Sequence, residues 1–457
     1  MPENVFVLGL DDGNLALLRR LPGAADLRFH TLLDISEVRI GYADYRRCLT
    51  RAEQRLETFD GSIDAITGYW DFPVTSLVPV LCERYGLPST SLESIVKCEH
   101  KYWSRLEQAE VVDAYPRFGL LDPATAEPAL PPGLEYPVWL KPVKSASSKL
   151  AFRVRDEAEL VRAVSRVRAE IDQVGGPFEA VLERVRLPPA IADVPGTACL
   201  VEEAVTGRQV TVEGYRYHHE PHVYGVIDSV TYPDSSSFLR YQYPSTLPPH
   251  LIAEVSDIAK RIAVRMNLRS TTFDVEFFVD VDTGRVSVLE VNPRLSQSHA
   301  RLFEHVDGVS NLHCMVNLAL GRDPAMPYRR GPYGMAAKCF LRRFTDGVVR
   351  RVPTAAEIAR LEAEIPGLTV DVTTAEGNVL SDQYARDSYS YELADVHLGA
   401  RDADELDELH ERCVRSLRFE IDDRGGPDGP EDAGNTVDTA EHDPYPRERA
   451  GGRPCAP

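Results

Sequence analysis

The sequence predicts a multi-domain protein of mixed α/β and α+β class, in which a doubly wound α/β domain precedes a larger region and a small C-terminal lobe. Three observations support this class. The chain has 457 residues, enough for two or three domains of ordinary size. Strands and helices alternate near its N-terminus, and a later two-stranded hairpin carries acidic residues at matching positions. The contents of 43% hydrophobic and 27% charged residues are those of a globular protein that buries a core.

The charge and the cysteines argue against several kinds of partner. A net charge of −20 would repel phosphates, so neither nucleic acid nor an anionic membrane is expected as a partner. The eight cysteines are scattered without a C-x-x-C pair, which indicates free thiols in a reducing compartment. The N-terminus has no signal-peptide pattern, and no apolar stretch approaches ~18 residues. We therefore expect a cytoplasmic protein.

Residues 1–95 form the first predicted domain. The apolar strand 5–10 leads through a turn into a helix, and a strand over 63–70 is followed by a helix over 74–89. This alternation is typical of a parallel sheet with crossover helices. The turn after the first strand lacks the G-x-G-x-x-G pattern of dinucleotide-binding folds, so NAD is not expected.

Residues 96–330 form the second predicted domain. A proline-rich connector over 121–137 precedes an apolar strand at 138–143. The pattern that follows predicts, in order, a helix over 155–171, strands over 198–205 and 209–218, a helix over 252–267 and a hairpin over 273–292.

The remainder of the chain changes character twice. Short strands and a helix return over 331–421, which predicts a small α+β lobe. Residues 422–457 are rich in Gly, Pro and acidic residues and offer almost nothing to bury. A disordered acidic tail is expected there.

The hairpin places two carboxylates opposite each other. A three-residue turn that ends at Gly284, in the left-handed conformation, makes Val281 face Arg285. Counting back from that turn pairs Glu276 with Glu290. Two acids in this relation repel each other, whereas a divalent cation between them makes the contact favourable.

Asn292 adds a third oxygen ligand to this pair. It lies two positions after Glu290, so the two side chains share one face of the strand. A small set of oxygen ligands suits Mg²⁺, which takes its other ligands from water and phosphates. The alternative, three polar groups on a solvated strand face, stays open.

A phosphate-bound metal requires cations nearby, and two lysines are candidates. Lys141 ends an apolar strand, where a lysine is costly unless it meets an anion. Lys101 precedes a helix. Taken alone, each fits a simpler role as a lysine that reaches solvent. The loop after Lys141 offers hydroxyl and N–H groups that suit phosphate oxygens, at Ser145, Ser147 and Ser148.

Together these features resemble the ATP-grasp superfamily. The order of segments carries the resemblance: Lys101 before a helix, then YPVWLKPVKSASSKL, CLVEEAVTGRQVTVEG and DVEFFVD…VSVLEVNPRLSQSH. Members include D-alanine–D-alanine ligase, biotin carboxylase and bacterial dipeptide ligases. The resemblance covers about residues 95–325 closely. Residues before it resemble the superfamily's preceding α/β domain, and 334–421 resemble the C-terminal lobe of carboxylase-like members. It implies an ATP-grasp fold, in which two lobes clamp ATP.

The resemblance implies roles for the residues that match nucleotide-binding positions. Lys101 and Lys141 match the lysines that contact the α- and β-phosphates. Glu202, Glu203 and Val205 match the hinge that binds adenine between the lobes.

Two other positions depart from the superfamily's usual pattern. Gln209 stands where many members carry a glutamate for the ribose hydroxyls. Ala146 and Leu150 stand where the phosphate-binding loop commonly has glycines, while the loop serines keep it small and polar.

The resemblance also implies the metal ligands and the catalytic set. Glu276, Glu290 and Asn292 match the ligands of two Mg²⁺ ions, which Mn²⁺ may replace. Arg294 matches the arginine that steadies the transferred phosphate. Arg294, Lys141 and Asn292 are thus the implied catalytic residues.

The implied activity is that of an ATP-dependent carboxylate–amine ligase of the acid–amino-acid type. A carboxylate attacks the γ-phosphate of ATP to give an acyl phosphate and ADP, and an amine then displaces phosphate to form an amide. Arg240, Ser296 and His299 are expected to contact the substrates, a small-molecule carboxylate and an amine. The alternatives are a carboxylate–thiol or bicarbonate-using enzyme and a non-catalytic ATP-binding regulator. The sequence leaves a protein acceptor and a homodimer open.

Overall fold

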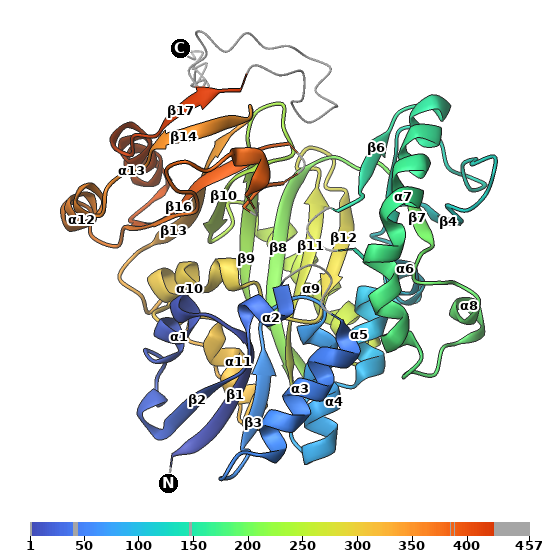
Figure 1. Ribbon diagram of the computed structural model, residues 1–457, viewed down its shortest axis with the longest axis horizontal. Coiled ribbons are helices and arrows are strands. Elements are labelled where there is room, and N and C mark those ends of the chain that lie inside the picture. The colour runs from blue at the N-terminus through green and yellow to red at the C-terminus, as the bar shows by residue number, and fades with distance from the viewer. Residues whose placement is uncertain (1, 40–43, 146–148, 384, 388, 425–457) are drawn as a thin grey trace, which may run out of the picture.

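A computed structural model of the chain describes residues 2–39, 44–145, 149–383, 385–387 and 389–424 (Figure 1). Within these ranges the strands form four sheets, of three, four, eight and two strands. No helix of the described ranges combines the length and the apolar character needed to span a bilayer. The seven cysteines of these ranges are free, as their spacing predicts, and all of them are buried.

The N-terminal segment forms a parallel sheet, as its sequence predicts. In spatial order the sheet consists of β2 (Leu27–Asp34), β1 (Glu3–Leu10) and β3 (Ala65–Gly68). Its helical elements are α1 (Asp12–Leu18), η1 (Ala24–Asp26), α2 (Ile35–Arg39), α3 (Tyr45–Glu57) and α4 (Val74–Tyr85). Asp11 begins α1 because its carboxylate accepts a hydrogen bond of 2.8 Å from the backbone N–H of Asn14.

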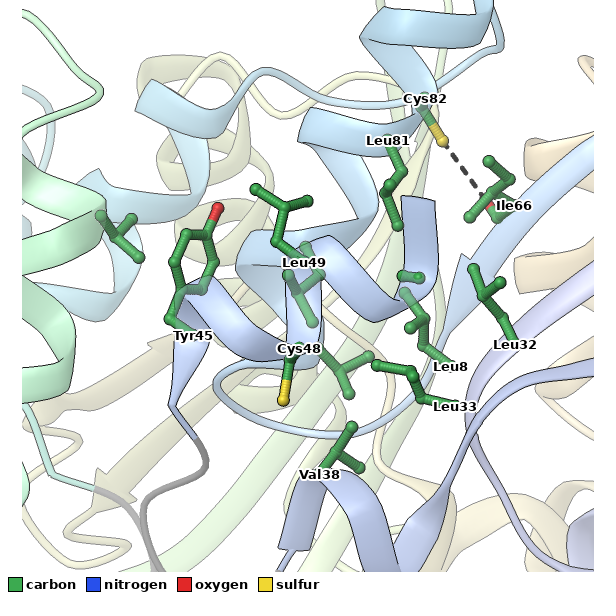
Figure 2. Close-up of a cluster of buried hydrophobic side chains, with 14 of the residues drawn as sticks. Leu8, Leu32, Leu33, Val38, Tyr45, Cys48, Leu49, Ile66, Leu81 and Cys82 are labelled. Carbon is green, nitrogen blue, oxygen red and sulfur yellow. Dashed lines mark hydrogen bonds between the residues drawn. The ribbon is translucent and has the colours of Figure 1, made fainter. Parts of the chain in front are cut away.

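Apolar residues at alternating positions of β1 are buried on both faces of this sheet. One face packs Phe6 and Leu8 against α3 and α4, and Figure 2 shows part of this cluster. The other face packs Val5 and Val7 against α1 and α11 (Leu312–Ala319). Because α11 belongs to a distant part of the sequence, this second cluster anchors the N-terminal sheet to the rest of the molecule.

Two helices lead from the N-terminal sheet into a four-stranded antiparallel sheet. They are α5 (Leu92–Glu99) and α6 (Lys101–Ala109). In spatial order the sheet consists of β4 (Phe118–Leu121), β7 (Cys199–Glu203), β5 (Val138–Pro142) and β6 (Phe152–Val154). It packs against α7 (Glu157–Leu182), which is longer than the predicted helix over 155–171, and α8 (Pro189–Ala192) follows.

An antiparallel sheet of eight strands forms the centre of the molecule. Its spatial order is β12 (Val286–Asn292), β11 (Thr271–Val279), β8 (Arg208–Tyr217), β9 (Glu220–Thr231), β10 (Phe238–Tyr243), β13 (Met335–Arg343), β16 (Tyr391–Ala400) and β15 (Thr369–Val372). One face of β8 and β11 packs against α9 (Pro249–Arg265), near the predicted helix. On the other face of the sheet, α10 (Ala300–Asp307), which follows η2 (Gln297–His299), packs against β9, β10 and β13.

Most strands of the described C-terminal segment do not form a separate sheet, and only β14 (Gly347–Arg351) and β17 (Glu420–Asp423) pair with each other in a two-stranded sheet. The others, β13, β16 and β15, extend the central sheet beyond β10, where orange strands run beside green ones (Figure 1). The segment also contains α12 (Ala355–Glu364), η3 (Leu380–Asp382) and α13 (Ala403–Ser416). The first two residues of the predicted tail belong to β17, and the part from 425 onward lies outside the described residues.

The hairpin of β11 and β12 has the predicted pairing of its acids but not the predicted turn. Val279 pairs with Val286, one residue out of the expected register, so the connection is longer than three residues. Gly284 adopts the left-handed conformation as predicted, with φ of 74°. A bulge at Leu289 then restores the register, which puts Glu276 opposite Glu290.

Candidate active site

Two carboxylates face each other at the centre of the candidate site. Glu276 on β11 lies directly opposite Glu290 on β12. Burial and the charge of Glu290 raise the pKa of Glu276 to about 7. Burial also acts to raise the pKa of Glu290, but the ammonium of Lys101, which donates to its Oε1, outweighs burial and lowers that pKa. The excess of negative charge at this pair suits a divalent cation.

Asp274 is a carboxylate of this site that sequence reasoning missed. It lies opposite Asn292, and its Oδ1 accepts a hydrogen bond of 2.9 Å from Asn292 Nδ2. Only 2% of Asp274 is exposed, and burial raises its pKa well above the usual range, although Arg294 acts in the opposite direction. The spacing of Asp274 and Glu276 carries the signal that identifies it, because residues two apart on a strand share a face.

Lys101 and Lys141 approach the carboxylates from two different elements. Lys101 is the first residue of α6, and its ammonium donates to Glu290 and, at 3.2 Å, to the backbone carbonyl of Ser145. Lys141 lies on β5, and its ammonium contacts the carboxylate of Glu202 on β7. Both lysines line one pocket together with Glu202 and Glu290. The structure therefore brings the two predicted phosphate-binding lysines together.

Arg105 on α6 lines the same pocket as the two lysines. The sequence did not identify it as a site residue, because it is one of many charged residues on a helix. Its Nε contacts Glu202, and its Nη2 donates a hydrogen bond of 2.8 Å to the carbonyl of the bulged Leu289. Burial opposes ionisation of Glu202, but Arg105 and Lys141 lower its pKa to about 2. Burial lowers the pKa of Lys141. Lys141, Glu202 and Arg105 thus form a buried ionic triad.

Arg294 links the hairpin to the N-terminal sheet. Its Nε donates a hydrogen bond of 2.8 Å to Asp71, which follows β3, and its Nη1 lies 3.6 Å from Asp274 Oδ2. Burial acts to raise the pKa of Asp71, but Arg294 holds it below the usual value. Ligands commonly bind beyond the carboxyl ends of parallel strands, and Asp71 lies at that edge. The N-terminal domain therefore contributes directly to the site.

His299 lies in a buried network behind Asp274. Its Nδ1 is 2.6 Å from Glu213 Oε1, and only 2% of His299 and 0% of Glu213 are exposed. Tyr224 and Asn311 also donate to Glu213, at 2.5 and 3.0 Å. Because Glu213 is directly opposite Asp274 on the neighbouring strand, the network supports the strand below the site. This geometry favours a structural role for His299 over the predicted substrate contact.

The other predicted substrate residues have partners of their own. Arg240 pairs with Asp407 of α13. The next residue, Tyr241, packs edge-on against His299 at 4.9 Å, so Arg240 points to the opposite face of the strand. The structure therefore separates Arg240 from the carboxylates. The carbonyl of Ser296 accepts a hydrogen bond of 2.9 Å from Asn311.

The predicted hinge and ribose positions flank the carboxylates. Glu203 lies 3.5 Å from the guanidinium groups of Arg117 and Arg285. Val205 follows β7 and is half-buried. Gln209 on β8 donates a hydrogen bond of 3.0 Å to Glu276.

Only part of the predicted phosphate-binding loop can be placed. Ser145 is buried. Ser147 and Ser148, with Ala146, lie outside the described residues.

The donor set fits Mg²⁺ better than a softer metal. Across the described ranges, no group of three or more His, Cys, Asp and Glu side chains is arranged to hold a metal. The site offers the facing carboxylates of Glu276 and Glu290 and the amide oxygen of Asn292, whose amide nitrogen is bonded to Asp274. Mg²⁺ accepts so few protein ligands because water and phosphate complete its octahedron. A cation here would also relieve the repulsion that raises the pKa of Glu276.

Part of the chain that carries these residues matches a known protein family. Residues 134–300 match the family model of the ATP-grasp domain. An L-amino acid ligase from Bacillus licheniformis superposes with a TM-score of 0.72 at 14% identity, over 92% of this chain and 99% of that chain. At the level of sequence, no curated protein matches this chain.

Two further solved structures share the architecture. A phosphoribosylglycinamide synthetase from Anaerococcus prevotii has a TM-score of 0.60 at 13% identity, over 92% of this chain and 100% of that chain. A biotin carboxylase from Campylobacter jejuni has a TM-score of 0.61 at 14% identity, over 92% of each chain. At these identities the neighbours establish the fold.

Lys101 and Lys141 come from α6 and the four-stranded sheet, whereas Glu276 and Glu290 come from the central sheet, so the site lies where these parts meet. Residues 134–300 match the ATP-grasp domain, and the fold of the chain is similar to that of the L-amino acid ligase. The predicted resemblance and the predicted fold class are confirmed.

Proposed function

We propose that the protein is an ATP-dependent ligase that joins a small carboxylic acid to an amine through an acyl phosphate, with release of ADP and phosphate. The observation that carries the proposal is the convergence of Lys101, Lys141 and Arg294 on Glu276 and Glu290 within an ATP-grasp fold. Such a cluster neutralises a triphosphate and its metal in a water-poor site.

The proposed nucleotide contacts follow the positions of the side chains. Lys101 and Lys141 contact the phosphates, and the hinge at Glu203 and Val205 lines the adenine. Glu202 acts differently from the implied hinge role, because its carboxylate already holds Lys141. Gln209 remains our candidate for the ribose.

Mg²⁺ would be held by Glu276, Glu290 and Asn292, and when bound it would neutralise charge on the phosphate oxygens. A biotin carboxylase domain from Hydrogenobacter thermophilus with the same fold was solved with MgADP, which supports ATP and Mg²⁺ as ligands here. The number of ions and their replacement by Mn²⁺ stay predictions.

The proposed reaction has two steps. A carboxylate oxygen attacks the γ-phosphorus, the bond from that phosphorus to the β–γ bridging oxygen breaks, and ADP leaves. The amine nitrogen then attacks the acyl carbon, the bond from carbon to the phosphate oxygen breaks, and the nitrogen loses a proton. Arg294, whose orientation is fixed by Asp71, is placed to steady the transferred phosphate.

Hydroxylamine trapping tests this function without knowledge of the amine. The protein is incubated with ATP, Mg²⁺, hydroxylamine and pools of amino acids and small carboxylic acids, with the Glu290→Gln variant as blank. ADP and a hydroxamate that both depend on one acid would support an acyl phosphate. ATP binding without ADP from any pool would contradict the proposal and favour a regulatory nucleotide-binding protein. A homodimer and a cytoplasmic location stay predictions.

A further inference from the structure

A second polar region lies on the same face of the central sheet as the carboxylates. Gln209, which donates to Glu276, is opposite Ser229 on β9. Ser229 is opposite Tyr241 on β10, and Tyr241 is opposite Lys338 on β13. Side chains that are paired in this way project from one face. This row of paired side chains therefore leads from the proposed Mg²⁺ site at Glu276 to the strands of the C-terminal segment.

Tyr241 spans the distance between the two regions. Its ring packs edge-on against the rings of His299, at 4.9 Å, and Phe340, at 5.1 Å. Burial raises the pKa of Tyr241, and the charges of Glu276 and, from the other region, Glu392 act in the same direction.

Two ion pairs form this second region. Lys338 Nζ lies 2.7 Å from Asp395 Oδ2, and Arg342 Nη2 lies 3.0 Å from Glu392 Oε2. Both cations lie close to the ring of Phe340, at 4.8 and 5.1 Å from its centre. The net charge of this second region is close to zero, whereas the proposed Mg²⁺ site has an excess of negative charge.

The two ion pairs differ in how fully they are bonded. Arg342 donates to Glu392, Asp387, Ser390 and the carbonyl of Phe238, so each of its nitrogens has a partner. Among the described residues, Lys338 has a single oxygen partner, Asp395, for its three N–H groups.

Buried atoms without a hydrogen bond adjoin the Lys338 pair. The Lys338 side chain is 10% exposed and that of Asp395 is 15% exposed, yet Asp395 Oδ1 accepts no hydrogen bond by geometry among the described residues, and the neighbouring carboxyl group of Glu392 adds negative charge beside it. His397, opposite Lys338 and with a side chain 9% exposed, likewise has an Nδ1 without a hydrogen bond in this part of the chain. Polar atoms in this state cost free energy unless a ligand or water completes their bonds.

We infer that Lys338 and Asp395 bind the amine substrate, and that this substrate is an amino acid whose carboxylate contacts Lys338 and whose ammonium contacts Asp395. The inference rests on the proposed ligase function and adds the substrate class. A zwitterion matches the pair because it supplies an acceptor to the spare N–H groups and a donor to the free oxygen. Tyr241 lies between this position and the carboxylates where the acyl phosphate would form.

Calorimetric titration tests the amine site apart from turnover. The full chain, with Mg²⁺ and a non-hydrolysable ATP analogue, is titrated with the proteinogenic L-amino acids one at a time. Each amino acid that binds is then compared with its amide and its N-acetyl derivative. We expect both derivatives to bind at least tenfold more weakly, because each lacks one charge. Absence of binding by any amino acid, or equal binding of the derivatives, would overturn the inference.

Variants identify the residues and provide a matched control. Lys338→Met and Asp395→Asn should each weaken amino acid binding at least tenfold, whereas Lys338→Arg should retain it. Lys260→Met, on α9 across the sheet, should leave binding unchanged. If Lys338→Met fails to fold, the binding of the amide and N-acetyl derivatives to the natural chain still tests the inference. Hydroxamate formation needs no amine site, so absence of hydroxamate with the natural chain would reject the proposed ligase function. Hydroxamate formation by Lys338→Met would show that this variant still activates the acid.

Discussion

Asn292 donates a hydrogen bond of 2.9 Å to Asp274, the residue directly opposite it on the neighbouring strand. Because the amide nitrogen is held in this way, the amide oxygen points away from Asp274 and stays available to a metal ion. Asp274, which was not among the predicted site residues, thus orients Asn292, which was.

Substitution of Asp274 should therefore change the requirement for Mg²⁺. We expect Asp274→Ala to raise the Mg²⁺ concentration for half-maximal ADP release by about tenfold or more, as for other residues that orient metal ligands. Asp274→Asn should have a smaller effect because its amide oxygen can still accept the hydrogen bond. An unchanged Mg²⁺ requirement in Asp274→Ala would argue against this role.

Glu290→Gln should abolish ADP release and leave the fold intact. The substitution keeps the shape of the side chain but removes a proposed metal ligand and the ionic partner of Lys101. Acid-dependent ADP release and circular dichroism are the two measurements. Glu304→Gln, in a surface ion pair with Arg20, serves as the control and should behave as the natural chain. Full activity in Glu290→Gln would reject the metal assignment.

Lys141→Ala should raise the ATP concentration needed for half-maximal activity at least tenfold, because a phosphate partner is lost from a buried position. The dependence of ADP release on ATP measures this directly. Lys260→Ala removes a lysine from the opposite face of the sheet and should leave the ATP dependence unchanged. The same ATP dependence in both variants would count against the phosphate role.

Glu202 should make stability depend on pH in the acidic range. Its pKa is about 2 in the folded protein, against an ordinary value of 4.5 for a glutamate. Its ionised form therefore stabilises the fold fully above pH 4.5, by about 3 kcal/mol, and this contribution is lost as the pH falls toward 2.

Denaturant unfolding of the natural chain and Glu202→Gln checks this dependence. The difference in their free energies of unfolding should be largest near neutral pH and should shrink below pH 4.5. A difference that stays constant between pH 7 and pH 3 would show that the triad does not act through the ionised carboxylate.

The pairing of the two central carboxylates could be predicted from the sequence, although the predicted length of the hairpin turn was wrong. Glu276 and Glu290 do lie opposite each other. The connection at the tip of the hairpin is longer than predicted, and the bulge at Leu289 cancels that error. Bulges leave no clear mark in a single sequence, whereas the alternation of acids and apolar residues does.

The partners that hold the site could not be predicted, because they come from distant segments. Asp71 follows a strand of the N-terminal sheet, yet it fixes Arg294. Arg105 is one charge among many on a helix, yet it holds Glu202 and the bulge. Such contacts depend on how the domains pack against each other, and the periodicity of apolar residues within one helix or strand carries no information about that packing.

The central sheet contains strands from both sides of residue 330, so a truncation at that boundary would cut through the sheet. A chain that ended at residue 330, the predicted boundary, would lose β13 and leave β10 as an unpaired edge from Arg240 to Tyr243. It would also uncover Tyr243 and Ile227, which pack with Ala336. Free strand edges beside apolar surface promote association between molecules. The shortened protein should therefore aggregate, and expression as separate halves should succeed only if both are produced together.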